Sequence, residues 1–301
     1  MRIVKDGAEY DFLMFLEMIK SNPQGWIACT FPFSKKMPHE ELVSKKAFIP
    51  VALANLQEEV DAFVEDVRIT VDALPHAVLF KFADGDVILL CNPRTDAEQQ
   101  LVRNALVDVT GRFPKGFCDY GFLTQELHVF HKIADHKFLA VKKMQAYETL
   151  GSAPVTNSLG LRRKRREEPL VLIVEDDRFT ASYIANFLKE YELVVARSGE
   201  EAVLAYLEHA PDAVFLDIHL PGMSGHQVLQ CIKAADPDAF VVMLSVDTSH
   251  SSIMSASEGG AVSFLKKPFS RERLLNTLRL SPHIKSSAGV LPIHSGKKTH
   301  Y

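Results

Sequence analysis

The stretch Leu-Val-Leu-Ile-Val-Glu-Asp-Asp at residues 170–177 decides the fold of the C-terminal part of the chain. Its run of five apolar residues is typical of a strand that is buried on both faces, as in a parallel sheet. Three carboxylates follow where that strand should end. In an open α/β sheet, ligands and chemistry collect outside the carboxyl ends of the parallel strands. The stretch therefore predicts a central strand with a functional site at its end.

Four further apolar runs follow, separated by segments with helical spacing. The predicted strands are residues 193–196, 213–216, 240–244 and 261–265, and the predicted helices include residues 179–190, 200–208 and 271–280. Ser198, with Glu201 three residues later, forms a capping box that opens the second of these helices. The alternation predicts a doubly wound α/β domain of roughly a hundred residues with a five-stranded parallel sheet.

Carboxylates follow two of the predicted strands. Glu175 and Asp176 end the first strand, and Asp217 ends the third, after Ala-Val-Phe-Leu. Like charges this close repel each other unless a cation neutralises them. An all-oxygen cluster with open water positions suits Mg²⁺ or Mn²⁺. We therefore expect these three side chains to form a divalent metal site.

Two further polar groups belong to the same predicted edge. Ser245 follows Val-Val-Met-Leu, and Lys267 lies in Lys-Lys-Pro at residues 266–268. A hydroxyl and an ammonium group can bind the oxygens of a phosphoryl group carried on Asp217. Taken singly, an acidic residue at a strand end is more often a helix cap and a Lys-Pro pair is usually a turn. Their joint occurrence at the strand ends favours a site that makes and holds an acyl phosphate.

Residues 170–280 resemble the CheY-like receiver domain of two-component response regulators, whose fold is flavodoxin-like. The resemblance implies that Asp217 is the phospho-acceptor, Asp176 a direct metal ligand and Glu175 its acidic companion. It also implies that the backbone carbonyl of His219 is a further metal ligand. Asp177 lies one residue beyond this acidic pair and is interpreted as a polar neighbour of the site, not as a metal ligand.

The same resemblance assigns a switch. Ser245 corresponds to the switch hydroxyl, Phe264 to the switch aromatic residue, and Lys267 to the lysine that precedes a cis proline. One departure is Val246, because most receivers have alanine after the switch hydroxyl. The resemblance implies that His219 and Asp247 flank the entrance for attacking water, and we expect them to pair.

Composition sets further bounds on the protein. A chain of 301 residues favours two domains, and a formal net charge of −4 gives no overall bias towards nucleic acid. No apolar run approaches the ~20 residues that span a bilayer, and the first residues lack the apolar stretch of a signal peptide. The four cysteines lack CxxC spacing. We expect a cytoplasmic protein without membrane insertion, and binding of nucleic acid is not expected.

Four segments are predicted along the chain. They are an α+β domain at residues 1–150, a flexible basic linker at 151–169, the receiver at 170–281 and a disordered tail at 282–301. The basic run Arg162–Arg166 is interpreted as a solvated tether, and contact with nucleic acid or anionic lipid is the alternative. The boundaries rest on the change to small, polar and then basic residues after residue 150.

The first half of the chain carries less information. Helical spacing at residues 10–19, 51–65, 96–109 and 122–147 alternates with a strand at 26–31 and a hairpin at 77–91. Asp84-Gly85 suits a type I′ hairpin turn. This order weakly resembles the palm-like fold of diguanylate cyclase (GGDEF) domains. The tandem glycines of that family are absent, and the end of the strand at 26–31 has no metal-binding carboxylate, so the resemblance implies a degenerate, non-catalytic domain.

These patterns predict a response regulator that is not itself an enzyme beyond its own phosphotransfer. A sensor histidine kinase or phosphotransfer protein is the expected donor, and phosphorylation is expected to change the N-terminal domain or its partner contacts, including homodimer formation. Two alternatives remain open. The receiver is an unphosphorylated docking module, or residues 1–150 are a regulated enzyme resembling a nucleotide cyclase.

Overall fold

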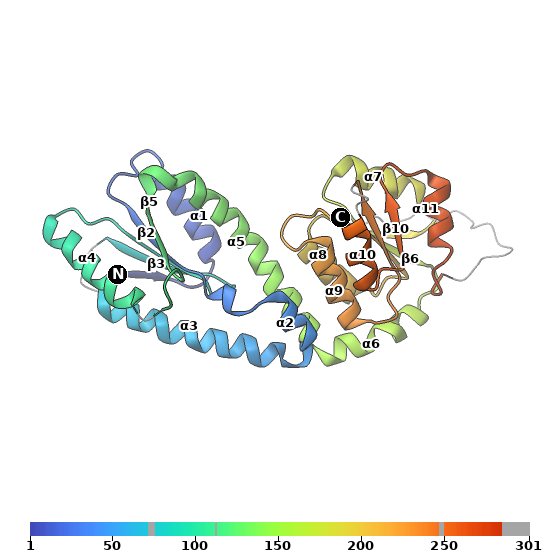
Figure 1. Cartoon of the computed structure of the whole chain (residues 1–301), viewed down its shortest axis with the longest axis horizontal. Coiled ribbons are helices and arrows are strands. Elements are labelled where there is room, and N and C mark those ends of the chain that lie inside the picture. Colours follow the sequence, from blue (N-terminus) through green and yellow to red (C-terminus); the bar gives the residue numbers. More distant parts are fainter. Residues whose placement is uncertain (72–75, 112, 247–249, 285–301) are drawn as a thin grey trace. The chain divides into compact units, whose positions relative to one another are not determined.

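The computed structural model describes residues 1–71, 76–111, 113–246 and 250–284, without the side chains of residues 250–253. The chain divides into two compact units (Figure 1). Unit 1 comprises residues Met1–Pro38 and Pro50–Met144, and unit 2 comprises His39–Ile49 and the chain from Gln145 onwards. Over the described residues, no helix is both long and apolar enough to cross a membrane.

A parallel five-stranded sheet forms the centre of unit 2. Its strands are β6 (Leu170–Val174), β7 (Glu192–Ala196), β8 (Ala213–Asp217), β9 (Val241–Ser245) and β10 (Ser263–Lys266). The strand order is β10-β9-β8-β6-β7, which is the flavodoxin-like order of a doubly wound fold. Every residue of β6, β8 and β9 is buried, as the continuous apolar runs predict. The predicted fold class of this part of the chain is confirmed.

Helices cover both faces of this sheet (Figure 1). They are α7 (Arg178–Phe187), α8 (Gly199–His209), α9 (Gly225–Ala235), α10 (His250–Glu258) and α11 (Arg271–Leu278). Ile184 of α7 and Leu274 of α11 share one core cluster with Val171 and Phe215 of the sheet. The apolar faces of the helices thus bury the sheet, and because all its strands are parallel, their carboxyl ends lie at one edge.

The predicted flexible linker is wrong, because most of it is helical. Helix α5 (Leu123–Gly151) is followed directly by α6 (Ala153–Lys164). Arg162 donates hydrogen bonds to the carbonyl oxygens of Leu207 and Glu208, at 2.5 and 2.6 Å. The last carbonyl groups of a helix have no partner within the helix, so guanidinium groups bind them well. The basic run therefore caps α8, and it is not a solvated tether.

The predicted domain boundary also differs from the structure, since part of the N-terminal half belongs to unit 2. Helix α2 (His39–Ser44) contacts α9. Lys46 Nζ donates a hydrogen bond to the carbonyl oxygen of Ala234 at 2.5 Å, and the His39 ring lies beside Tyr147 of α5. This packing was hidden in the sequence because the contacting residues are far apart along the chain. The predicted disordered tail lies outside the described residues from position 285 onwards.

Unit 1 has a mixed sheet. Its strands are β1 (Arg2–Val4), β2 (Ile27–Phe31), β3 (Ala77–Lys81), β4 (Val87–Cys91) and β5 (Asp119–Phe122), in the order β1-β3-β4-β2-β5. Strand β1 pairs with β3 in parallel, and the other pairs are antiparallel. The succession β2-α3-β3-β4-α4-β5 is a βαββαβ arrangement. The predicted α+β class is confirmed, and the resemblance to a degenerate GGDEF domain stays a prediction.

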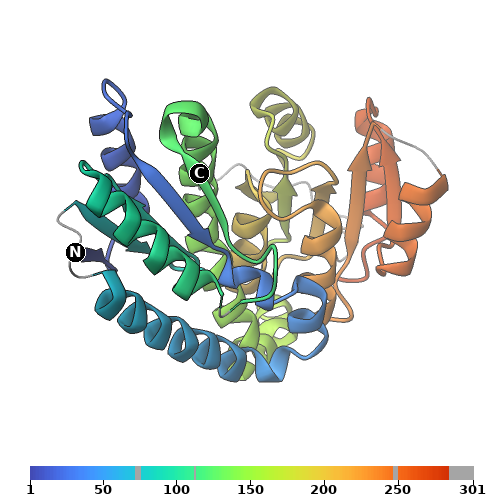
Figure 2. The ribbon, with the colours of Figure 1, turned by 60° about the vertical axis from the view of Figure 1, so that its left-hand side comes forward.

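Both faces of this sheet are covered. Helices α3 (Ile49–Val71) and α4 (Asp96–Thr110) share one core cluster with it (Figure 2). Helix α1 (Ala8–Ile19) and the first half of α5 share the other cluster. Short helical turns at Phe33–Lys36 and Lys46–Phe48 complete the elements of the first half.

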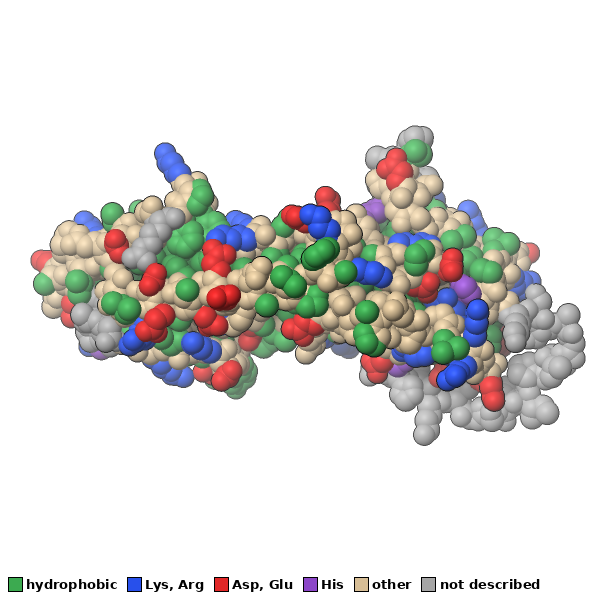
Figure 3. Space-filling model, turned by 90° about the horizontal axis from the view of Figure 1, so that it is seen from below, with side chains coloured by type: hydrophobic (Ala, Val, Ile, Leu, Met, Phe, Trp, Pro, Cys, Tyr) green, Lys and Arg blue, Asp and Glu red, His purple; other side chains and the backbone are tan. Residues whose placement is uncertain are grey.

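Acidic and basic side chains are interspersed on the face shown in Figure 3, in agreement with the modest net charge of −4.

The hairpin turn between β3 and β4 differs from the predicted type I′ turn. Gly85 N–H donates to Phe82 O at 3.0 Å, and Phe82 N–H donates to Asp86 O at 2.9 Å. Gly85 has a positive φ of 84°, whereas Asp84 does not, so the loop is a type I turn followed by a bulge at the glycine. The loop turns Asp84 and Asp86 towards Lys137 of α5, whose ammonium group binds both carboxylates.

Candidate functional site

The three predicted metal ligands come together at the carboxyl edge of the sheet in unit 2. Glu175 and Asp176 follow β6, and Asp217 ends β8. One oxygen from each lies within 4.8 Å of the other two. Glu175 and Asp217 are buried and Asp176 is exposed. Within the described part of the chain, this is the single cluster of three or more such side chains that fits a metal ion.

Lys267 bridges two of these carboxylates. Its Nζ lies 2.5 Å from Glu175 Oε2 and 3.0 Å from Asp217 Oδ1. Its backbone N–H donates to Ser245 O at 2.8 Å, which holds the lysine at the end of β9. The peptide bond between Lys267 and Pro268 is cis, as the family resemblance implies.

The electrostatics of the cluster favour a cation. Burial raises the pKa of Glu175, Lys267 opposes that rise, and the charges of Asp217 and Asp176 add to it. Three carboxylates against one ammonium group leave two negative charges uncompensated. An oxygen-only ligand set of this charge, partly open to solvent at Asp176, suits a hard divalent cation.

The two predicted switch residues lie on β9 and β10. Asp217 pairs with Leu244 in the parallel ladder, so Ser245 follows at the same edge of the sheet. Ser245 is fully buried. Phe264 lies on β10 and is half-buried. Ser245 thus lies on the strand next to the acceptor, and Phe264 lies one strand further from it.

The loop after Asp217 carries the remaining predicted ligand. His219 is exposed, and its backbone carbonyl belongs to this loop. The predicted pairing of His219 with Asp247 falls outside the described residues, whereas Val246 is described and exposed. Asp177 Oδ1 accepts hydrogen bonds from Thr180 N–H and Oγ1, so this carboxylate caps α7.

Arg163 and Glu200 are among the buried charged residues of unit 2 that were not predicted from the sequence. Arg163 donates to Pro211 O at 3.0 Å and to the Tyr206 hydroxyl at 2.9 Å, and it pairs with Asp236. Glu200, in the first turn of α8, accepts from Met223 N–H at 2.9 Å. Both lie in helical patterns where a charged residue is normally solvated, so the sequence holds no signal for their burial.

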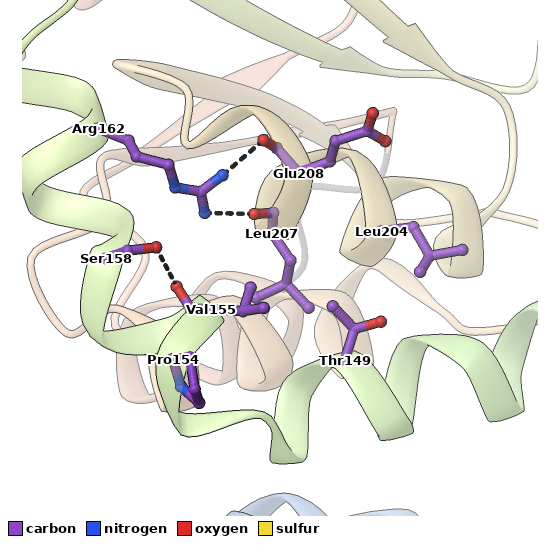
Figure 4. A pocket seen from close by; sticks show the side chains of 8 residues that line it. All are labelled: Thr149, Pro154, Val155, Ser158, Arg162, Leu204, Leu207 and Glu208. Atoms are coloured by element: carbon purple, nitrogen blue, oxygen red, sulfur yellow. Dashed lines mark hydrogen bonds between the residues drawn. The ribbon is translucent and has the colours of Figure 1, made fainter.

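A pocket of about 500 Å³ lies between α6 and α8 (Figure 4). Its lining is mainly apolar, with Val155, Leu204 and Leu207 among the contributors. Arg162 lies at its border and points to the α8 carbonyl groups, as the dashed lines in Figure 4 show. The carboxylate cluster does not contribute to this pocket.

The C-terminal part of the chain is similar to known proteins. Residues 171–279 match the model of the response regulator receiver domain family. The chemotaxis protein CheY of Listeria monocytogenes serovar 1/2a is 40% identical over 111 residues, which are 36% of this chain and 93% of that protein. CheY of Bacillus subtilis strain 168 is 37% identical over 111 residues, covering 36% of this chain and 92% of the relative. A solved structure of Vibrio cholerae CheY4 aligns with 38% of this chain and 98% of its own, with 26% identity and a TM-score of 0.37.

A doubly wound sheet with an acidic cluster and a lysine at its carboxyl edge defines a receiver domain. Together with the extent of the sequence match to CheY, it shows that this chain belongs to the response regulator family of two-component signalling. Receiver domains of this family interact with histidine kinases or phosphotransfer proteins. The family match covers residues 171–279 and therefore describes unit 2 and not unit 1.

Proposed function

We propose that this protein accepts a phosphoryl group on Asp217 from a phosphohistidine of a sensor kinase or phosphotransfer protein. The observation that carries the proposal is the approach of Lys267 Nζ to within 3.0 Å of Asp217 Oδ1, beside the cluster of three carboxylates. A carboxylate oxygen of Asp217 attacks phosphorus, the P–N bond to the imidazole breaks, and an acyl phosphate forms. The imidazole leaves with the electron pair of that bond.

The residues of the site have different roles in this reaction. Glu175, Asp176, Asp217 and the His219 carbonyl would hold Mg²⁺ or Mn²⁺, which supplies positive charge to the phosphoryl oxygens when bound. Lys267 and Ser245 donate hydrogen bonds to those oxygens. Ile218 N–H donates to Asp217 Oδ1 at 2.9 Å, which orients the acceptor. The buried walls around Asp217 limit access of water to the acyl phosphate.

Phosphorylation then acts as a switch. Ser245 moves towards the phosphoryl group and Phe264 turns inward, which favours one of two pre-existing states of unit 2. The change alters the surface of α10, β10 and α11 and thereby the contacts of the protein, including association of two copies. A receiver that only docks, without phosphorylation, would need neither the acidic cluster nor the lysine.

We also propose that unit 1 regulates or binds and does not catalyse. In its hairpin turn, Lys137 Nζ lies 2.7 Å from Asp84 Oδ2 and 2.5 Å from Asp86 Oδ2. An ammonium group thus neutralises both carboxylates of this turn, which disfavours their binding of a catalytic metal. Turnover of guanosine or adenosine triphosphate by the full chain with Mg²⁺ would contradict this part of the proposal.

The test of the phosphorylation proposal is labelling with acetyl phosphate and Mg²⁺, read by intact mass. We expect one added phosphoryl group on the wild-type chain and none on Asp217→Asn or in the presence of a chelator. Asp177→Asn is the matched control, because Asp177 caps α7 and should leave labelling intact. A phosphorylated Asp217→Asn chain would exclude Asp217 as the acceptor.

A further inference from the structure

Glu200 is a buried carboxylate outside the cluster just described. It lies in the first turn of α8 and only 1% of it is exposed. Its Oε1 accepts a hydrogen bond from Met223 N–H at 2.9 Å. Burying a carboxylate is costly unless its oxygens are bound, so this hydrogen bond offsets part of the cost.

The partner is the loop that begins at Asp217. This loop, residues 218–224, connects the phospho-acceptor at the end of β8 to the first residue of α9. Glu200 holds it at Met223, and the N–H of the neighbouring Gly199 approaches the carbonyl oxygen of Pro221 at 3.4 Å. The start of α8 therefore fixes the far half of the loop whose near half carries His219.

Gly222 shows how closely the two segments approach. A Cβ atom at this position would lie 2.3 Å from Glu200 Oε2, and the residue has a φ of 75°. Both facts require glycine here, because any side chain would displace the carboxylate. An added methyl group at Gly222 would therefore press on the Glu200 carboxylate.

Unit 2 also contains a buried pair of residues from α2 and α5. Tyr147 of α5 is 2% exposed, and its hydroxyl lies 2.8 Å from His39 Nδ1 of α2. Burial raises the pKa of Tyr147, and the charges of Cys231 and Glu200 raise it further. Glu200 therefore lies within electrostatic reach of Tyr147 as well as in contact with the loop.

We propose that Glu200 is a positioning residue for phosphorylation, which fixes the loop after Asp217 so that the His219 carbonyl is held ready for the metal ion. This inference rests on the proposed phosphorylation of Asp217. Glu200 does not touch the metal or the phosphoryl group, and it acts through Met223 N–H. Removal of a residue that holds a metal ligand in place, without binding the metal itself, typically changes metal affinity by roughly 10- to 100-fold.

The experiment compares full-length Glu200→Ala, Glu200→Gln and Glu208→Gln with the wild type. Glu208 is an exposed carboxylate near the other end of α8 and serves as the control. Mg²⁺ affinity is measured by titration calorimetry. Labelling by acetyl phosphate is followed over a range of Mg²⁺ concentrations, and the protection of residues 218–224 is measured by hydrogen exchange. Glutamine keeps an oxygen that accepts from Met223 N–H, so it separates the hydrogen bond from the charge.

We expect Glu200→Ala to weaken Mg²⁺ binding by roughly 10-fold, to raise the Mg²⁺ concentration for half-maximal labelling and to speed exchange at Met223. Glu200→Gln should keep all three properties close to those of the wild type, and Glu208→Gln should match the wild type. Wild-type Mg²⁺ affinity and wild-type loop protection in Glu200→Ala would overturn the proposal. Failure of the wild-type chain to become labelled would instead reject the phosphorylation of Asp217, and the calorimetry and hydrogen exchange would still decide the role of Glu200.

A second variant keeps the test decisive if Glu200→Ala does not fold. Gly222→Ala places a methyl group against the carboxylate and should also weaken Mg²⁺ binding. Gly116→Ala is its matched control, since Gly116 has a similar φ of 85° but no atom within 4 Å of the added methyl group. Equal Mg²⁺ affinities of the two glycine variants would count against the positioning role.

Discussion

Lys267 Nζ lies 3.0 Å from Asp217 Oδ1 and 2.5 Å from Glu175 Oε2, so that one ammonium group joins two carboxylates from the ends of different strands. The lysine thus occupies the position where it can bind a phosphoryl oxygen on Asp217. It also opposes a divalent cation by its own charge. Removal of the ammonium group should therefore weaken binding of the phosphoryl group and strengthen binding of the cation.

We predict that Lys267→Ala binds Mg²⁺ at least as tightly as the wild type but is labelled roughly 100-fold more slowly by acetyl phosphate, a loss typical of removing one donor to a developing charge. Calorimetry measures the first property and intact mass over time the second. Lys266→Ala is the control, because Lys266 is exposed at the adjacent position. Normal labelling of Lys267→Ala would remove the lysine from the mechanism.

The Arg163–Asp236 pair should contribute strongly to the stability of unit 2. Burial by itself raises the pKa of Asp236, but hydrogen bonds from Arg163 and Tyr206 outweigh burial and lower it. Replacing Arg163 with methionine leaves a buried carboxylate without its cation. We expect Arg163→Met to lower the free energy of unfolding by about 3 kcal/mol at pH 7, measured by calorimetry, whereas the exposed Arg165→Met should change little.

The same pair predicts a pH dependence. The lowered pKa of Asp236 means that its stabilising contribution is present above the ordinary carboxyl pKa and is lost as the pH falls through the lower value of the folded state. In Arg163→Met, burial dominates and Asp236 binds a proton more readily. The stability difference between wild type and variant should therefore shrink as the pH falls from 7 to 3. A difference that is constant with pH would argue against this ion pair.

In unit 1, Lys137→Met tests the buried turn of the hairpin. Burial raises the pKa of Asp84, Lys137 opposes the rise and Asp86 adds to it. Without the ammonium group, we expect a loss of about 3 kcal/mol in the free energy of unfolding at pH 7. The loss should be smaller at pH 5 than at pH 7, because an acid whose pKa is raised in the folded state binds a proton more readily as the pH falls, and this proton binding favours folding.

Urea unfolding of Lys137→Met can be followed by fluorescence of Trp26, the single tryptophan of the chain, which packs against Phe15 in unit 1. Lys132→Met, on an exposed position of the same helix, is the control. An equal loss at both pH values would show that the lysine contributes by packing on Phe82 rather than by its charge.

Association is the expected output of phosphorylation. Met254 of α10 and Val262 beside β10 are exposed apolar side chains on the surface that the switch is proposed to change. We predict that beryllofluoride with Mg²⁺ raises the mass of the full-length chain in light scattering, with no rise for Asp217→Asn. Identical mass and identical hydrogen exchange with and without beryllofluoride would favour the docking alternative, in which the receiver is never switched.

The sequence by itself determined the parallel sheet and the composition of the site. Strands that are buried on both faces must be apolar throughout, so the runs that precede Glu175, Asp217 and Ser245 are visible without any knowledge of their partners. Because parallel strands end at one edge, the polar residues after those runs had to converge. The structure places three carboxylates and Lys267 together as this reasoning predicts.

Only the tertiary structure decided what surrounds that site. The run Arg162–Arg166 looks like a solvated tether because its partners, which include backbone carbonyl groups of α8, lie more than 40 residues away and carry no sequence signal. The same holds for Lys137, whose partner Asp84 is 53 residues distant. The amino-acid sequence shows which residue types prefer contact with water. Whether a particular charged residue can be buried depends on the neighbours that the fold brings to it.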